Sequence, residues 1–127
     1  MAVRFGLILL AGLCVTACGG SSTYAPSPSP TPTPAPTGTT ATVTIVSGAS
    51  TRTTMAYSPN PLNVSVGTMV TWVNNDTTTH DSTAVNGSFT TGSIAPGRSA
   101  SFTFQSAGSF PYYCTIHPGM VATVNVQ

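Results

Sequence analysis

The chain has 127 residues, of which only 4% are charged, and its formal net charge at neutral pH is +1. This length allows one modest domain. So few charges exclude both an acidic tail and the basic stripe that nucleic-acid binding requires, and we expect no nucleic-acid partner.

The first segment, residues 1–17, is predicted to be an export signal. A positive Arg4 precedes an apolar run from Phe5 to Val15, which is too short to span a bilayer, and small residues follow. Val15-Thr16-Ala17-Cys18 resembles the bacterial lipobox, in which cleavage leaves a lipid-modified Cys18 as the new N-terminus. An ordinary secretory signal cleaved near Ala17 is the alternative.

We expect a lipoprotein in the periplasm or at the cell surface, held by the lipid on Cys18. Gly19 follows this cysteine, whereas Asp at that place resembles a retention signal for the inner membrane, so the sequence favours the outer membrane. Cys14 would leave with the signal and Cys18 would be blocked by lipid. Cys114 is then the only free thiol in an oxidising compartment, where an unpaired cysteine needs a reason.

Residues 18–39 are predicted to be a tether. Six prolines occupy every second position from Pro26 to Pro36, among Ser, Thr, Ala and Gly. Proline fixes φ and removes a donor, which favours an extended polyproline-like spacer of roughly 3.1 Å per residue. The folded domain is expected at residues 40–127.

From Thr40 onward, short alternating runs rich in Val, Thr, Phe and Tyr are separated by Gly, Pro, Asn or Ser. These runs predict strands, and no window has a helical period. Turn signals recur at the spacing typical of an antiparallel sandwich. The predicted fold class is an all-β, Greek-key β-sandwich. The expected strands are Ala41–Val46, Arg52–Tyr57, Leu62–Val66, Met69–Asn74, Ser99–Gln105, Gly108–Cys114 and Val121–Val126.

The side chains that predict chemistry lie mainly in the segment Cys114-Thr115-Ile116-His117-Pro118-Gly119-Met120. It contains the lone free thiol and one of the two histidines, while the other histidine, His80, follows a predicted strand. Separately, a Met, a His or a Cys is more often core filling or a surface residue. Together, His80, Cys114, His117 and Met120 are the trigonal His₂Cys set with a weak thioether that marks blue-copper sites.

This segment, with Gly108-Ser109-Phe110-Pro111-Tyr112-Tyr113 before it, resembles the copper loop of the cupredoxin family, which includes plastocyanins, pseudoazurins and amicyanins. Its Cys-x-x-His-x-x-Met spacing is most similar to amicyanin. Val70-Thr71-Trp72-Val73-Asn74-Asn75-Asp76, with His80 after it, resembles the strand that leads to the first histidine ligand. The resemblance covers the chain from about Thr40 to Gln127.

One position departs from the family pattern. The residue after the first histidine is typically Asn in plastocyanin and amicyanin, and here it is Asp81. Asp81 can accept a hydrogen bond from a backbone N–H near Thr115, but it cannot donate, and its charge would favour Cu(II). Asp81 and Thr115 are therefore expected to lie just outside the ligands and to tune the site.

The resemblance implies an electron carrier that cycles one copper ion between Cu(I) and Cu(II), with no enzymatic activity and no organic substrate. His117 would be the electron port, and Ile116, Pro118 and Gly119 would form an apolar docking rim around it. The expected partners are redox proteins, and we expect a monomer.

Other functions remain as alternatives. A periplasmic copper chaperone or copper-resistance protein ranks second, although it would usually add Met-rich or His-rich tracts. A Cys–His nucleophile pair lacks the acid, base and oxyanion donors that an enzyme needs. Structural zinc seldom accepts a thioether. A structural immunoglobulin-like module would leave the free thiol unexplained.

Overall fold

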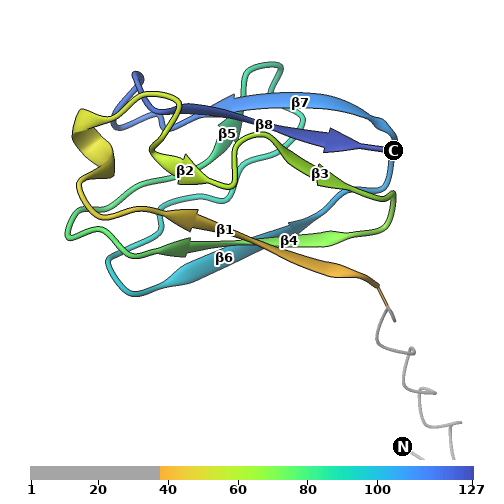
Figure 1. Ribbon diagram of the computed structural model, residues 1–127, viewed down its shortest axis with the longest axis horizontal. Coiled ribbons are helices and arrows are strands. Elements are labelled where there is room, and N and C mark those ends of the chain that lie inside the picture. The colour runs from red at the N-terminus through yellow and green to blue at the C-terminus, as the bar shows by residue number, and fades with distance from the viewer. Residues whose placement is uncertain (1–37) are drawn as a thin grey trace, which may run out of the picture. The chain divides into compact units, whose positions relative to one another are not determined.

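The computed structural model describes residues 38–127, which form a sandwich of two four-stranded sheets (Figure 1). The first sheet has the strand order β2-β1-β4-β6 and the second has the order β3-β8-β7-β5. The strands are β1 (Thr40–Ile45), β2 (Tyr57–Ser58), β3 (Leu62–Val64), β4 (Met69–Asn74), β5 (Thr83–Ala84), β6 (Ser99–Thr103), β7 (Gly108–Tyr113) and β8 (Val121–Val126).

The all-β sandwich is confirmed, but its sheets are mixed and not purely antiparallel. β1 pairs in parallel with β4, and β3 pairs in parallel with β8, whereas the other strand pairs are antiparallel. Parallel neighbours require a long connection. After β1 and β2 the chain therefore crosses to the second sheet to form β3 and then returns to the first sheet as β4. Among the described residues, no helix is long and apolar enough to cross a bilayer.

The strand predicted at Arg52–Tyr57 is largely wrong. Residues 49–51 form a short 3₁₀ helix, η1 (Ala49–Thr51), and only Tyr57–Ser58 forms a strand, β2. The side chains of residues 52–55 are exposed and the backbone turns back through a hydrogen bond from Ala56 N to Thr53 O. Alternation alone does not make a strand when no neighbouring strand accepts its hydrogen bonds.

Smaller differences concern strand ends and one short strand. The predictions for β4 and β8 match the observed bounds, whereas β5, a two-residue strand paired with the end of β7, was not expected. The strand expected at Leu62–Val66 is shorter, because β3 ends at Val64 and Val66 lies beyond it, 47% exposed.

The core between the sheets is largely aromatic. Trp72 of β4 is fully buried and stacks on Phe89, with ring centroids 5.5 Å apart, and meets Tyr112 of β7 edge-on at 5.7 Å. Each large apolar side chain removed from water contributes about 1.5–3 kcal/mol. This cluster therefore fixes β4 against β7, the two strands that lead into the residues with metal-ligand chemistry.

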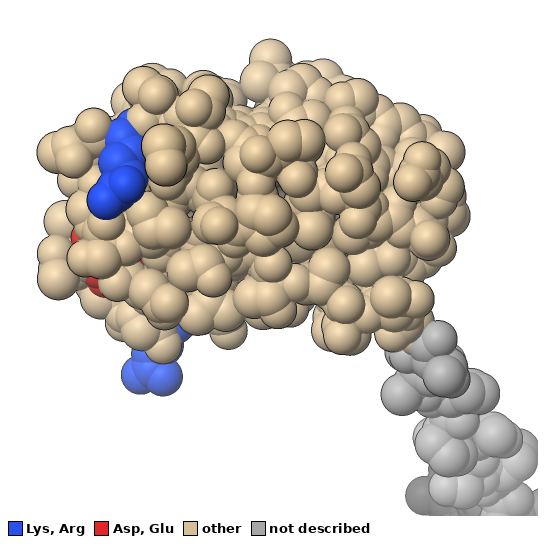
Figure 2. Space-filling view, in the orientation of Figure 1, with Lys and Arg blue, Asp and Glu red and all other residues tan. Residues whose placement is uncertain are grey.

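The two ends of the sandwich differ in what they expose. Thr39 O accepts from Met69 N at the start of β4, and Val66 N donates to Gln127 O, so the beginning of β1 and the C-terminus lie at one end. η1 and the ends of β1 and β4 lie at the other end, where Figure 2 shows the arginine side chains of the described residues.

Candidate metal centre

The first histidine is held at the end of β4 by a network of side-chain and backbone hydrogen bonds. Asn74 Nδ2 donates to Thr78 O at 2.7 Å and to Ile94 O at 2.8 Å, which closes the loop after the strand. His80 and Ile94 then exchange both backbone hydrogen bonds. The His80 side chain is fully buried as a result.

The other candidate ligands lie in the turn that joins β7 to β8. Cys114 N donates to Met120 O at 3.1 Å, and Met120 N donates to His117 O at 2.9 Å, so the loop folds back on itself. Cys114 and Met120 are fully buried, whereas His117 is partly exposed. This turn brings Cys114, His117 and Met120, which are three residues apart in sequence, close together at one end of the sandwich.

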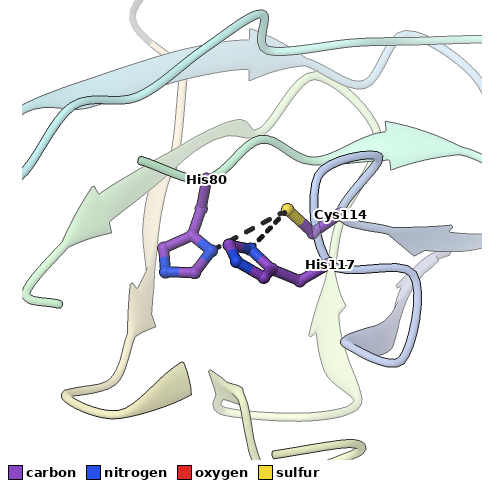
Figure 3. Close-up of side chains that lie close together, drawn as sticks. All are labelled: His80, Cys114 and His117. Carbon is purple, nitrogen blue, oxygen red and sulfur yellow. Dashed lines mark hydrogen bonds between the residues drawn. The ribbon is translucent and has the colours of Figure 1, made fainter. Parts of the chain in front are cut away.

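Figure 3 shows that His80, Cys114 and His117 face one another across this end of the sandwich. Cys114 Sγ lies 3.8 Å from His80 Nδ1 and 3.9 Å from His117 Nδ1. The ligand atoms of the three residues all lie within 4.8 Å of one another. The structure therefore brings together three of the four residues predicted as metal ligands, and it places Met120 buried in the same loop.

The separations fit a shared metal ion better than direct hydrogen bonds. A nitrogen and a sulfur bound to one ion at roughly 2.0 and 2.3 Å, with about 120° between them, lie roughly 3.7 Å apart. The observed 3.8 and 3.9 Å agree with that value. Two imidazoles and one thiol in this arrangement are the donor set of a type 1 copper site.

Asp81 ties the two ligand-bearing segments together. Its Oδ1 accepts from Thr115 N at 2.7 Å and from Thr115 Oγ1 at 3.1 Å, which is the contact expected from the sequence. Oδ2 accepts from Thr83 Oγ1 at 2.7 Å. Burial would raise the pKa of the Asp81 carboxyl, but these hydrogen bonds and one from Cys114 lower it, so the group is ionised at neutral pH.

Burial of the Cys114 sulfur favours its protonated form. Burial raises the pKa of the Cys114 thiol, and the thiol can donate to Asp81 Oδ1 at 3.2 Å. The backbone N–H of Asp81 also points at the sulfur, 3.5 Å away, and this contact would favour the thiolate. A metal that binds here must displace the proton.

Two residues of this region were not identified from the sequence as part of the site. Tyr57 of β2 donates its hydroxyl to Asp81 O at 2.6 Å, beside the first histidine. Asp76 is buried, and its Oδ2 lies 2.9 Å from His80 Nε2, within hydrogen-bond distance. The sequence did offer a reason to consider Asp76, because it is one of only two acidic residues in the chain and lies four residues before His80.

The remaining predicted positions divide into the docking rim and the lipid site. Ile116 is 49% exposed, and Pro118 and Gly119 are exposed beside His117. The lipidation prediction at Cys18 lies outside the described residues, as do the signal segment 1–17 and nearly all of the tether at 18–39. The domain boundaries remain predictions.

Known proteins resemble this chain in sequence and in fold. Residues 43–127 match the family described as copper binding proteins, plastocyanin/azurin family. Amicyanin from Paracoccus denitrificans is 33% identical over 78 residues, which cover 58% of this chain and 60% of amicyanin. The chain thus aligns with less than two thirds of that relative's length.

Solved structures extend the comparison. A purple cupredoxin from Nitrosopumilus maritimus superposes with a TM-score of 0.63 and 34% identity, covering 68% of this chain and 99% of that protein. A methionine-to-alanine mutant of amicyanin in its Cu(I) form superposes with a TM-score of 0.58 and 30% identity, covering 68% of this chain and 80% of amicyanin.

Proposed function

Because this chain belongs to the plastocyanin/azurin family of copper binding proteins, we propose that it is a blue-copper electron carrier. Its ligands would be His80, Cys114, His117 and Met120. The observation that supports this function best is the convergence of two imidazole Nδ1 atoms on the buried Cys114 sulfur, at 3.8 and 3.9 Å. Copper bound there supplies one-electron chemistry, since it exchanges between Cu(I) and Cu(II).

The ligand residues are held in place by hydrogen bonds within the chain. Backbone hydrogen bonds fix His80 to Ile94 and Cys114 to Met120, and Asp81 joins the two segments. A close-packed interior resists rearrangement. Ligands that stay in place in both oxidation states make electron transfer fast, and a rigid buried site favours an electron carrier over a chaperone that must release its metal.

His117 offers the path for the electron. It is the partly exposed member of the ligand set, and its neighbours in the chain, Ile116, Pro118 and Gly119, are exposed and would form the docking rim. Redox proteins could dock on this rim and approach the imidazole edge directly. We propose that the chain transfers electrons in this way and transforms no organic substrate.

The location in the cell envelope is a proposal from the sequence. Lipid on Cys18 would hold the chain at the membrane, and the Pro-rich segment would act as a tether. The first strand begins at the end of the sandwich opposite the ligand residues. A tether entering at Thr40 would thus leave the docking rim accessible. Replacing Cys18 with Ala should release the chain from membrane fractions, and retention would contradict lipid anchoring.

The electron-carrier function is tested by the visible spectrum of the purified full chain loaded with copper. We expect one copper per chain and an intense blue colour on oxidation, because the Cys114 thiolate donates charge to Cu(II). Cys114→Ser should lose the colour, with circular dichroism as the control for folding. A blue Cys114→Ser protein, or a wild-type chain that binds zinc with no preference for copper, would refute the assignment.

A further inference from the structure

Asp76 is a buried carboxylate that accepts hydrogen bonds from three backbone N–H groups and one hydroxyl and lies beside the His80 ring. The side chain is 4% exposed. Oδ1 accepts from Gly48 N at 2.9 Å and from Thr77 N at 2.8 Å. Oδ2 accepts from Ala49 N at 3.1 Å and from Thr78 Oγ1 at 3.3 Å, and it lies 2.9 Å from His80 Nε2.

These donors are all satisfied only if both oxygens of residue 76 accept hydrogen bonds. An ionised carboxylate has about four acceptor positions and no donor, whereas an amide must place an N–H₂ group at one of the two positions. Whichever position the N–H₂ group of an Asn took, it would face a backbone N–H group, and that N–H group would have no acceptor.

The contact with His80 determines which imidazole nitrogen carries the proton. His80 Nε2 lies 2.9 Å from Asp76 Oδ2 and also 2.9 Å from Thr78 Oγ1, whose own proton points at Asp76 Oδ2. Both neighbours therefore offer acceptor lone pairs to Nε2, so Nε2 is the donor and the lone pair is left on Nδ1. Nδ1 is the atom that faces Cys114 Sγ at 3.8 Å. We propose that Asp76 is a positioning residue, which fixes the tautomer and the ring orientation of His80 so that Nδ1 is presented to the metal. This inference rests on the proposed copper site.

The same carboxylate anchors the ring to a distant part of the fold. Gly48 and Ala49 lie 28 and 27 residues before Asp76, at the start of η1. Gly48 has φ of 71°, a left-handed conformation that directs its N–H and the next one toward the same carboxylate. His80 is therefore braced against η1 through Asp76.

The experiment uses ¹⁵N NMR of the metal-free full chain, at mildly alkaline pH, to read the His80 tautomer. We expect wild-type His80 to be protonated at Nε2, with an Hε2 proton that exchanges slowly with solvent. Asp76→Asn should give a mixture of tautomers. It should also weaken copper binding about 10- to 100-fold, the usual cost of losing the partner that orients a histidine ligand.

Asp81→Asn is the matched control, because it removes the same charge near the same cluster without touching the His80 ring. It should leave the tautomer as in wild type. The proposal is overturned if wild-type His80 is protonated at Nδ1, if both variants shift the tautomer equally, or if Asp76→Asn changes neither the tautomer nor the copper affinity. If Asp76→Asn does not fold, slow exchange of the wild-type Hε2 proton supports the proposal and fast exchange overturns it. The tautomer is read without metal, so a colourless copper-loaded wild type would refute the proposed function separately.

Discussion

Asp81→Asn changes the charge beside the ligand residues while preserving the contacts of the side chain. The amide oxygen can replace Oδ1 and keep both hydrogen bonds from Thr115, at 2.7 and 3.1 Å. The amide nitrogen then faces Thr83 Oγ1, which can accept from it and donate to Thr90 Oγ1 at 3.0 Å. The substitution is therefore close to a pure loss of one negative charge.

The size of the effect follows from the position of the carboxylate. Asp81 Oδ1 lies 3.2 Å from Cys114 Sγ, and the side chain is buried. Unit charges about 5 Å apart interact by about 3 kcal/mol at an effective dielectric constant of about 20. For one electron, 1.4 kcal/mol corresponds to about 59 mV, so the charge is worth on the order of 100 mV. Because the carboxylate favours the more positive Cu(II), its removal should raise the reduction potential by that order.

The assay is a spectroelectrochemical titration of the copper-loaded wild type and the variant, at one pH and one ionic strength. The visible spectrum should change little, because the ligand residues are intact. Thr83→Val is the control, since it removes the hydrogen bond to Oδ2 without changing the charge, and its potential should move far less. A potential that is unchanged or lowered in Asp81→Asn would refute the electrostatic reasoning.

Four further outcomes are expected. Met120→Gln should keep the copper and lower the reduction potential in the same titration, because an amide oxygen favours Cu(II) more than a thioether does; an unchanged potential would make Met120 a core residue only. Since burial raises the pKa of the Cys114 thiol, the proton competes with copper, and the apparent affinity in a chelator competition should rise about tenfold per pH unit between about pH 7 and 8. Ile116 is 49% exposed beside His117, and Ile116→Lys should slow electron self-exchange between the oxidised and reduced chains, as measured by NMR. Val66 is 47% exposed at the opposite end of the sandwich, and Val66→Lys should leave this rate unchanged. Equal slowing in the two variants would place the electron port elsewhere. Phe104→Ala, at a residue 1% exposed, should lower the free energy of unfolding in urea by about 3–5 kcal/mol, and a loss below about 1 kcal/mol would contradict its place in the core.

The sequence by itself predicted the sandwich and the ligand set because both depend on local patterns. In β4 and β8 every second side chain is buried and the ones between are half-buried or exposed, and this period of two is visible in the residues themselves. Cys114, His117 and Met120 are close in the chain, so one turn is enough to bring them together. The two histidines of the chain left no other candidate for the first ligand.

Only the tertiary structure decided where hydrogen-bond partners distant in sequence would meet. The segment Arg52–Tyr57 has residues suited to a strand, yet most of it has no neighbouring strand to pair with and turns instead. β5 exists only because Tyr112 and Tyr113 pair with it. Asp76 lies 27 and 28 residues from the two N–H groups of η1 that it accepts from, and no local pattern encodes such a distance. A buried carboxylate must find its donors wherever the packed chain places them, because leaving it unpaired in the interior would cost far more than ordering the loops around it.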